Sequence, residues 1–424
     1  MNIRAGTVLV GLLLGVALWA QPNFDRVDAR AVAAPASSER SLDELVRYLC
    51  PSGYTERQKA RSLFRWVAER ITYDLDGLRN NKMGTQLPED VLRDRKAVCS
   101  GYSRLFKALG DKAGLKVVTL SGESKFNDQL PIKLPPGVSG HAWNAVFLED
   151  RWQLVDVTWA AGKADAQLKY KKEFDDYWFC TPAEQFVYTH LPKEEQWQLV
   201  DKPWSAAQFK ALPLIRGEFF RLGLKLAADT RQPLQVREDL VLRWPAPDDV
   251  VGMSDLRTAK GEVLENWTFS QSPKGYLETR LRCPRPGPYS LHVYARKRQP
   301  TVQGNLKDPV RFPGISVISV TGLRHSTYPY PKTFASFQRA GAELLEPFDG
   351  LLKSESKQRF RLRVPDAQEV AIFSGQDMLV RMELKRGFFE TSLRLPAKGN
   401  APLQVCGRFD QDSRYWGLVQ YELR

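Results

Sequence analysis

The sequence has few of the residues that bind metals or form disulfide bridges. Among 424 residues there are five cysteines and four histidines, with no C-x-x-C pair and no H-E-x-x-H motif. Such a set offers no ligands at the spacing of a structural zinc site. The long acidic loops that bind calcium are missing too. We therefore expect no metal and no cofactor. An odd number of cysteines leaves at least one thiol unpaired, which calls for reactivity or burial in an exported protein.

Long hydrophobic runs are also scarce. Hydrophobic residues make up 43% of the chain and charged residues 26%, which argues against wholesale disorder and against a protein with several membrane spans. The one extended apolar run covers residues 5–20, after Arg4 and before polar sequence. This pattern predicts a signal peptide over residues 1–20 and a secreted or periplasmic protein. An uncleaved membrane anchor is the alternative.

Acidic residues are fewer than basic ones, and the imbalance is local. The net charge is +13, of which residues 1–200 contribute +2 and residues 201–424 contribute +11. The basic C-terminal half could bind an anionic cell-surface polymer. The alternative is that its lysines and arginines are scattered over solvated strand faces. The export signal and the lack of a recognition element argue against nucleic acid as a partner.

The N-terminal half has helical and then strand patterns. Residues 21–40 show no periodicity, so we expect a linker there. Ser41 and Thr55 are capping residues that start amphipathic helices. A further helix is predicted to start near Cys99 and to stop at Gly114. Two strand-like runs then flank a short turn at residues 149–150, which predicts a β-hairpin. We take residues 41–204 as one domain.

The C-terminal half contains an internal repeat. Residues 275–282 (GYLETRLR) are echoed by residues 387–394 (GFFETSLR), and residues 240–245 (LVLRWP) by residues 360–365 (FRLRVP). Short alternating runs broken by proline and glycine are typical of strands. Two tandem copies predict two β-sandwich modules, which we bound as residues 205–312 and 313–424.

Cys99 is a candidate nucleophile because of its place at a predicted helix start. A helix N-terminus carries positive partial charge, which favours a thiolate, and a histidine can act as its base. With a two-residue hairpin loop, alternation puts His141, Trp143, Asp156 and Thr158 on one face of the hairpin. His141 and Asp156 are then diagonal neighbours, about 7–8 Å apart at the backbone. A three-residue loop with a bulge would break this relation.

These residues form a nucleophile, base and orienter arrangement. Asp156 beside His141 can fix the imidazole tautomer, as in a catalytic triad with Cys99. Ordinary structural roles must be weighed against this hypothesis. A buried cysteine commonly acts as a small hydrophobic residue, and a histidine on a strand is commonly a satisfied polar residue. For His190 we favour a structural role over a catalytic one.

The motifs around these residues resemble those of the transglutaminase-like superfamily. They are residues 95–102 (RKAVCSGY), 140–144 (GHAWN) and 152–159 (WQLVDVTW). Together with residues 176–179 (DYWF) and 186–192 (FVYTHLP), they are most similar to its kyphoscoliosis-peptidase branch. The resemblance covers about residues 50–200. It implies an α+β fold with a papain-like core, followed here by two all-β sandwich-like repeats.

The resemblance also implies a function. The family's catalytic residues correspond to Cys99, His141 and Asp156. Its members cleave amide bonds or transfer the acyl group to an amine, and both reactions begin with a thioester. We therefore expect an exported cysteine enzyme that acts on amide bonds of a peptide or protein. The alternative is a catalytically silent scaffold of the same fold that binds peptides or cell-surface polymers.

The sequence does not single out one oxyanion donor or one set of substrate-binding residues. The backbone N–H of Cys99 is the default donor to an oxyanion, and the side chains of Gln86, Tyr73 and Trp143 are further candidates. Trp143 and Trp159 could line a substrate cleft. An aromatic core is an equally good interpretation of both tryptophans.

Overall fold

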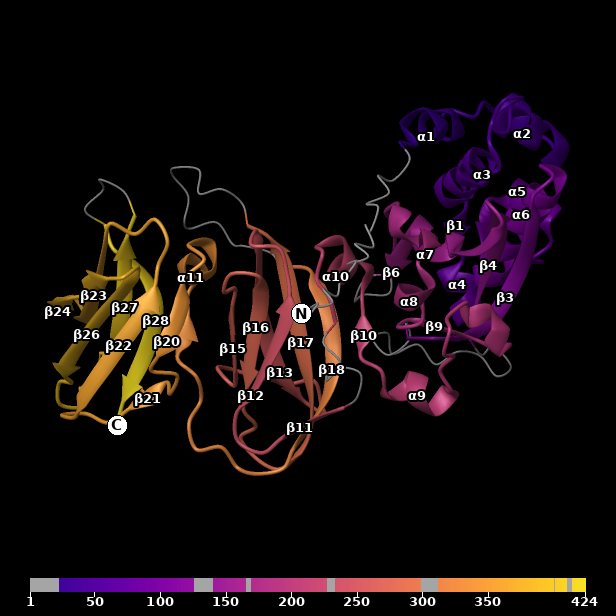
Figure 1. The fold of residues 1–424 in the computed structure, drawn as a ribbon. Coiled ribbons are helices and arrows are strands. Elements are labelled where there is room, and N and C mark those ends of the chain that lie inside the picture. Colours follow the sequence, from indigo (N-terminus) through magenta and orange to yellow (C-terminus); the bar gives the residue numbers. More distant parts are fainter. Residues whose placement is uncertain are drawn as a thin grey trace, which may run out of the picture. The chain divides into compact units, whose positions relative to one another are not determined.

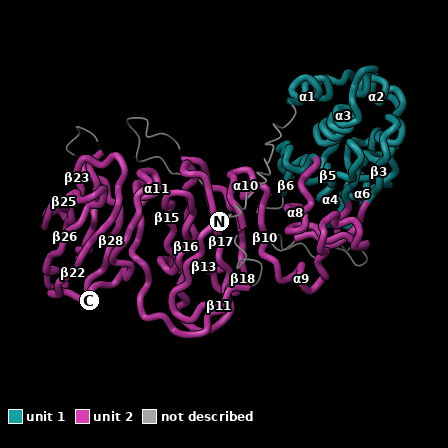
Figure 2. The backbone as a smooth tube through the Cα atoms, in the orientation of Figure 1, with its two compact units in different colours: residues 1–119, 143–179 teal, residues 120–142, 180–424 magenta. Residues whose placement is uncertain are grey.

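A computed structural model describes residues 23–125, 140–164, 169–226, 233–298, 312–399, 401–409 and 414–424. They form two compact units, coloured separately in Figure 2: residues 1–119 with 143–179, and residues 120–142 with 180–424. The division falls within strands β3 (Lys116–Ser124) and β4 (His141–Leu148), which therefore belong to both units. The predicted signal peptide lies outside the described residues. In the ranges above, no helix has the length and apolar character needed to cross a membrane.

Helices and short strands build most of the first unit (Figure 1). Its helical segments are α1 (Asp25–Val32), η1 (Ala36–Glu39), α2 (Leu42–Leu49), α3 (Glu56–Arg70), α4 (Leu75–Arg79), α5 (Pro88–Asp94), α6 (Cys99–Lys112), α7 (Val157–Ala161) and η3 (Asp176–Trp178). Its short strands are β1 (Thr72–Tyr73), β2 (Lys96–Ala97), β5 (Arg151–Val155), β6 (Gly162–Ala164) and β7 (Tyr170–Lys172).

The predicted helix starts are confirmed. The Ser41 side chain accepts a hydrogen bond from the Glu44 N–H at 3.2 Å. Thr55 and Gln58 form a complete capping box, in which each side chain accepts from the other residue's backbone N–H. The predicted apolar face of α3 is fully buried. These caps are local, which explains why sequence alone identifies them.

Part of the predicted linker at residues 21–40 is helical. Residues 25–32 form helix α1, which buries Val27 and Ala31. Asp28 on the same helix forms an ion pair with Arg61 of α3 at 2.6 Å. This helix was missed because its buried face contains so few apolar residues, so that packing against α3 rather than periodicity defines it.

The central hairpin has the predicted register. Leu148 pairs with Arg151, and Asn144 with Val155. Glu149 and Asp150 both adopt positive φ, 52° and 60°, as a two-residue type I′ turn requires. The hairpin lies in a five-stranded sheet of order β8-β5-β4-β3-β9, whose outer strands are β8 (Phe179–Thr181) and β9 (His190–Pro192).

One part of the hairpin prediction is wrong. Strand β5 ends at Val155, so Asp156 and Thr158 do not continue the ladder. Asp156 instead caps helix α7, where its Oδ1 accepts from the Trp159 N–H at 3.0 Å. The β-branched and aromatic residues of this segment suit a strand, but the capping carboxylate starts a helix there.

The rest of the second unit contains a short connecting region and two β-sandwiches. The connecting elements are α8 (Ala183–Phe186), η4 (Glu195–Gln198) and α9 (Ala206–Ala211). The first sandwich consists of β10 (Leu214–Ile215), α10 (Gly217–Arg221), β11 (Leu234–Val236), β12 (Leu240–Pro245), β13 (Val250–Thr258), β14 (Val263–Leu264), β15 (Thr268–Gln271), β16 (Tyr276–Leu281), β17 (Gly287–Lys297) and β18 (Gly314–Gly322).

The second sandwich repeats this order of elements with one additional strand, β20. It consists of β19 (Lys332–Thr333), α11 (Ala335–Arg339), β20 (Glu343–Glu346), β21 (Leu351–Leu352), β22 (Lys357–Arg363), β23 (Glu369–Ser374), β24 (Asp377–Arg381), β25 (Glu383–Lys385), β26 (Phe388–Arg394), β27 (Leu403–Arg408) and β28 (Trp416–Leu423).

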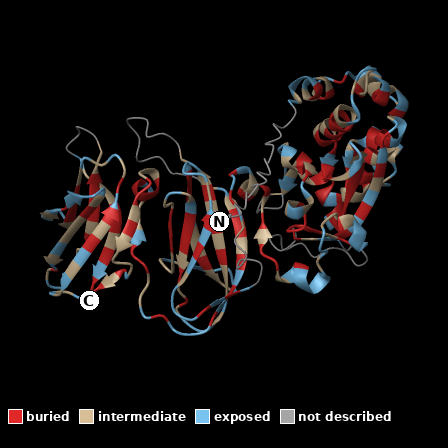
Figure 3. Ribbon diagram, viewed as in Figure 1, coloured by how far each residue is buried: buried red, intermediate tan, exposed pale blue. Residues whose placement is uncertain are grey.

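The two sandwiches have the same topology, which confirms the internal repeat. Sheet β10-β18-β17-β13-β14, with β11 added to β18, corresponds to sheet β19-β28-β27-β23-β24, with β21 added to β28. The opposite sheets are β12-β16-β15 and β20-β22-β26-β25. Each sandwich has its own apolar core, and buried and exposed residues alternate along its strands in Figure 3.

Strand register corrects two details of the predicted repeat. Arg243 pairs with Glu278 in the first sandwich, and Arg361 with Glu390 in the second. Arg243 is therefore equivalent to Arg361, whereas the sequence repeat aligned it with Arg363. Because the shift is two residues, the same side chains still face outward. The boundary at residue 313 is also wrong, because β18 pairs with β17 of the first sandwich.

Candidate active site

Cys99 is the first residue of helix α6, as predicted. Val98 before it is extended, with φ −95° and ψ 178°. The Val98 carbonyl accepts hydrogen bonds from the N–H groups of Gly101 at 2.9 Å and Tyr102 at 3.1 Å. No acidic residue occupies the first turn of the helix, and Cys99 is half-buried. The helix N-terminus therefore favours negative charge at the position of this thiol.

Gln86 holds the backbone just before Cys99. Its Oε1 accepts a hydrogen bond from the Val98 N–H at 3.0 Å, and its Nε2 donates to the Gly84 carbonyl at 2.9 Å. A Cβ atom at residue 101 would lie 2.5 Å from the same Oε1, so glycine is required for this close approach. The Gln86 amide thus positions the start of α6 and is engaged with the backbone at both ends.

Asn144 links helix α6 to the central sheet. This residue of β4 is fully buried, and its Nδ2 donates to the Ser103 carbonyl of α6 at 3.0 Å and the Val118 carbonyl of β3 at 3.2 Å. Ser103 lies one helical turn after Cys99, and Asn144 lies three residues after His141. One buried amide therefore ties the strand that begins with His141 to the helix that begins with Cys99.

Asp156 lies at the junction of β5 and α7. It is fully buried, its Oδ1 accepts from the Trp159 N–H at 3.0 Å, and its own N–H donates to the Trp178 carbonyl at 3.0 Å. The aspartate therefore keeps its predicted place at the end of the hairpin, although a helix cap rather than the strand ladder orients it.

His141 and Asp156 lie together, and His190 lies with them. One ligand-capable atom from each of these three residues is within 4.8 Å of the other two. The ring centroids of His141 and His190 are 5.4 Å apart. The grouping of His141 with Asp156 agrees with the hairpin prediction, whereas His190 had been assigned to a structural role.

The surroundings of His190 fix its imidazole ring. The ring stacks on Phe186 with centroids 4.0 Å apart, and its Nδ1 lies 2.8 Å from the Thr189 hydroxyl. Strand β9 brings His190 into the sheet by pairing with β3, where His190 is opposite Ser124. Only this non-local pairing places the residue near His141. The short alternating T-H-L-P run is the one sequence signal for such a strand.

Tyr73 lies near enough to Cys99 and Asp156 for both to affect the ionisation of its phenol. Burial raises the pKa of the Tyr73 phenol above its ordinary value, and the nearby Cys99 and Asp156 raise it further because they disfavour a second negative charge. The Tyr73 ring also contacts those of Tyr102 and Tyr170, at 6.4 and 6.1 Å between centroids. Tyr73 therefore stays a neutral phenol that can donate a hydrogen bond beside the thiol.

The two tryptophans proposed to line a substrate cleft differ in exposure. Trp143 is only 1% exposed, which favours the aromatic-core interpretation for this residue. Trp159 is partly exposed and meets Trp178 edge to face, with centroids 4.8 Å apart. A contact between Trp159 and substrate stays a prediction.

The group of His141, Asp156 and His190 contains side chains of the kind that bind metal ions, although the sequence predicted no metal site. Two imidazoles and a carboxylate are ligands that zinc and other transition metals accept. The sequence showed no ligands at a suitable spacing, but the fold assembles these three from β4, the β5–α7 junction and β9. They are the residues that could hold a metal ion, and they overlap the predicted catalytic pair.

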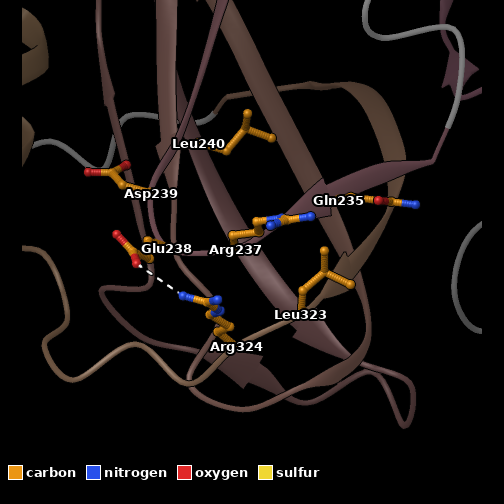
Figure 4. Close-up of a pocket in the computed structure, with 7 residues that line it drawn as sticks. All are labelled: Gln235, Arg237, Glu238, Asp239, Leu240, Leu323 and Arg324. Carbon is orange, nitrogen blue, oxygen red and sulfur yellow. Dashed lines mark ion pairs between the residues drawn. The ribbon is translucent and has the colours of Figure 1, made fainter.

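A separate pocket lies in the first sandwich (Figure 4). It has a volume of about 530 Å³ and is lined by residues around the β11–β12 connection and the end of β18. An ion pair of 3.8 Å joins Glu238 and Arg324 beside it. No cysteine or histidine lines this pocket, so it offers no nucleophile or general base of the kind found around Cys99.

The fold and the residues around Cys99 define a transglutaminase-like domain. Residues 43–157 match the model of the transglutaminase-like superfamily. Residues 206–312 match that of the KY-like, immunoglobulin-like domain. The chain therefore contains a transglutaminase-like domain, and a KY-like, immunoglobulin-like domain follows it.

Several curated proteins are similar to this chain. Kyphoscoliosis peptidase of Mus musculus is 33% identical over 202 residues, which are 47% of this chain and 30% of that protein. Hillarin of Drosophila melanogaster is 32% identical and covers 48% of this chain and 26% of its own length. The Lim and transglutaminase domain protein ltd-1 of Caenorhabditis elegans is 27% identical, covering 64% of this chain and 41% of its own. The chain thus spans less than half the length of these relatives.

Proposed function

We propose that this chain is a cysteine enzyme that attacks amide bonds of a peptide or protein through Cys99, His141 and Asp156. The observation that carries the proposal is the grouping of His141 with Asp156, together with the hydrogen bond by which Asn144, on the same strand as His141, holds the helix of Cys99. The transglutaminase-like domain and relatives named as a peptidase and a transglutaminase domain protein support the same reaction class.

Each residue of the proposed triad has a defined role. His141 takes the proton of the Cys99 thiol, and the sulfur attacks the carbonyl carbon of the amide while the carbonyl electrons move to oxygen. When the tetrahedral intermediate collapses, the C–N bond breaks and the leaving amine takes a proton from the imidazolium of His141. Water or a second amine, deprotonated by His141, then attacks the thioester and releases the Cys99 sulfur. Asp156 orients His141 throughout.

The oxyanion needs hydrogen-bond donors. The Cys99 N–H is the backbone candidate, because Cys99 is the first residue of helix α6 and the N–H groups at a helix start point out of the helix. Of the three candidate side chains, Gln86 is engaged with the backbone and Trp143 is buried. Tyr73 is a neutral phenol beside Cys99. We assign the side-chain donor to Tyr73.

Alkylation of Cys99 with iodoacetamide, followed by peptide mass spectrometry across pH, tests the nucleophile. Cys99 is expected to react well below the free-thiol pKa of about 8.5, and His141→Ala should remove this reactivity at low pH. Burial raises the pKa of Cys50 to about 12 and of Cys283 and Cys406 to about 11. These three thiols are internal controls, which we expect to react slowly in the folded protein because little thiolate forms.

Product analysis separates the possible outcomes. A glutamine-containing peptide, incubated with and without a fluorescent primary amine, distinguishes peptide cleavage, ammonia release and amine incorporation. Cys99→Ala should abolish all three, whereas Cys50→Ser should change none. An unreactive Cys99 in the folded protein would contradict the enzyme and support the catalytically silent scaffold.

Export stays a prediction, because residues 1–20 lie outside the described residues. Cell fractionation of the full chain and of a variant without residues 1–20 tests it. Recovery of the full chain in the cytoplasmic fraction would contradict a secreted or periplasmic location. Binding of an anionic cell-surface polymer to the basic modules is likewise a prediction.

A further inference from the structure

On the outer face of sheet β12-β16-β15 in the first sandwich, strands β15 and β16 contact the second sandwich. Gln271 on β15 accepts a hydrogen bond from the Leu344 N–H at 2.9 Å, and Gln338 donates to the Ser270 carbonyl at 2.8 Å. Phe269 of β15 is 2% exposed and packs within the core of the second sandwich. This face is therefore a docking surface for a protein module.

Arg282 is the charged centre of that docking surface. Its guanidinium forms an ion pair with Asp239 of the same sandwich at 3.3 Å and with Asp349 of the second sandwich at 2.8 Å. It also lies over the Tyr330 ring, 4.4 Å from the centroid, and the Tyr330 hydroxyl donates to Asp239 at 2.6 Å. Asp239 thus neutralises part of the Arg282 charge within the first sandwich, and the Asp349 carboxylate of the second sandwich supplies a second anionic partner.

The second sandwich carries the equivalent face with one charge reversed. In the first sandwich, Asp239 and Arg282 lie four positions along the strands from the Arg243–Glu278 pair. In the second sandwich, Lys357 and Arg394 lie four positions from the Arg361–Glu390 pair. Lys357 therefore takes the place of Asp239, and Arg394 takes that of Arg282. The acid–base pair of the first sandwich has become a pair of cations.

Lys357 and Arg394 are directly opposite each other on β22 and β26. Both are exposed, and within the described ranges neither forms an ion pair. Like charges directly opposite each other destabilise a sheet. Along the same strand, Arg359 contacts Glu346 and Glu390 at 3.3 and 3.1 Å, so the unneutralised charge is concentrated at the Lys357–Arg394 pair.

An aromatic side chain accompanies these cations. Phe388 of β26 is partly exposed and lies under the Arg361 guanidinium, 4.3 Å from the ring centroid. In the first sandwich Arg280 similarly covers Phe348 of the docked module at 3.9 Å. A mixture of cations and apolar side chains suits a protein surface better than a highly charged polymer.

We propose that the outer face of β22, β26 and β25 docks an acidic protein surface, with Lys357 and Arg394 binding its carboxylates. The repeat supplies the reason, because the equivalent face of the first sandwich docks a protein module through Asp349. With Lys357 in place of Asp239, this face requires at least one carboxylate more from its partner.

Lys357→Asp in the full chain is the sharpest test, because it restores the acid–base pair of the first sandwich. The probe is fluorescein-labelled poly-L-glutamate, a source of peptide carboxylates, with binding followed by fluorescence anisotropy at low salt. We expect the variant to bind about tenfold more weakly. The same substitution should raise Tm by roughly 1–4 °C, because it replaces a repulsion by an attraction.

Lys274→Asp is the matched control, since Lys274 is an exposed lysine of the first sandwich and the charge change is the same. It should weaken binding less than twofold. An equal loss in both variants would overturn the proposal, as would unchanged binding or a lower Tm in Lys357→Asp. If the chain binds polyphosphate or phosphatidylglycerol vesicles through Lys357 but does not bind poly-L-glutamate, the face serves an anionic polymer or membrane and the proposal is wrong.

Discussion

Asn144 donates from Nδ2 to the Ser103 carbonyl at 3.0 Å, deep between the central sheet and helix α6. A buried carbonyl that loses its donor keeps its desolvation penalty. We expect Asn144→Ala to lower the free energy of unfolding by about 1–3 kcal/mol and to slow Cys99 alkylation in the folded protein. Urea denaturation and mass spectrometry measure the two effects. Full stability together with an unchanged alkylation rate would contradict the role of Asn144 in positioning helix α6.

The Gln86 contact with Val98 predicts a difference between two substitutions. Gln86→Leu removes the acceptor for the Val98 N–H, whereas Gln86→Glu keeps one. The leucine variant should therefore lower the Cys99-dependent rate about fivefold, which corresponds to a hydrogen bond of about 1 kcal/mol. Glutamate should retain most of the activity. Equal losses in both variants would instead assign a direct role in catalysis to the amide group.

The buried phenols predict a loss of stability in alkaline solution. Burial raises the pKa of Tyr170 to about 12, whereas a phenol in the unfolded chain ionises near pH 10. The unfolded state therefore releases its proton first, so the contribution of Tyr170 is complete below about pH 10 and is lost as the pH rises toward 12.

Tyr170→Phe tests this dependence. The variant should reduce the fall in unfolding free energy between about pH 9 and pH 11.5 by an amount on the order of 1–2 kcal/mol, allowing for partial exposure. Urea denaturation at both pH values measures it, with the exposed Tyr276→Phe as control. An identical pH dependence in all three proteins would refute the assignment.

Phe269 predicts how strongly the two sandwiches are coupled. Its ring lies 5.6 Å from that of Phe337 and 5.5 Å from that of Phe348, centroid to centroid. Phe269→Ala should cost about 3–5 kcal/mol and separate the thermal transitions of the two modules. Leu384→Ala, at an exposed position, should change stability by less than about 0.5 kcal/mol. Calorimetry distinguishes these outcomes.

Local signals explain which parts of the fold and site could be predicted. The Thr55 capping box, the turn at Glu149 and Asp150 and the helix start at Cys99 each depend on residues that are close in sequence. The hairpin register then brings His141 toward Asp156 without further information. This part of the site was therefore accessible to an argument from alternation and turn length.

The remaining parts depend on contacts between distant segments. His190 reaches the site only because β9 pairs with β3, and no local pattern encodes that pairing. Strand β18 was assigned to the wrong module because its partner, β17, is separated from it by residues 298–313. In each case tertiary contacts override local preference.

The position of β18 also bears on the order in which the chain can fold during synthesis. Strands β10 and β11 both pair with β18, which is translated about a hundred residues after β10. The family match ends at residue 312, just before this closing strand. The sheet of the first sandwich therefore cannot be completed until β18 has been synthesised, and β10 and β11 lack their partner strand until then. An expression fragment that stops at residue 312 would remain in that unfinished state.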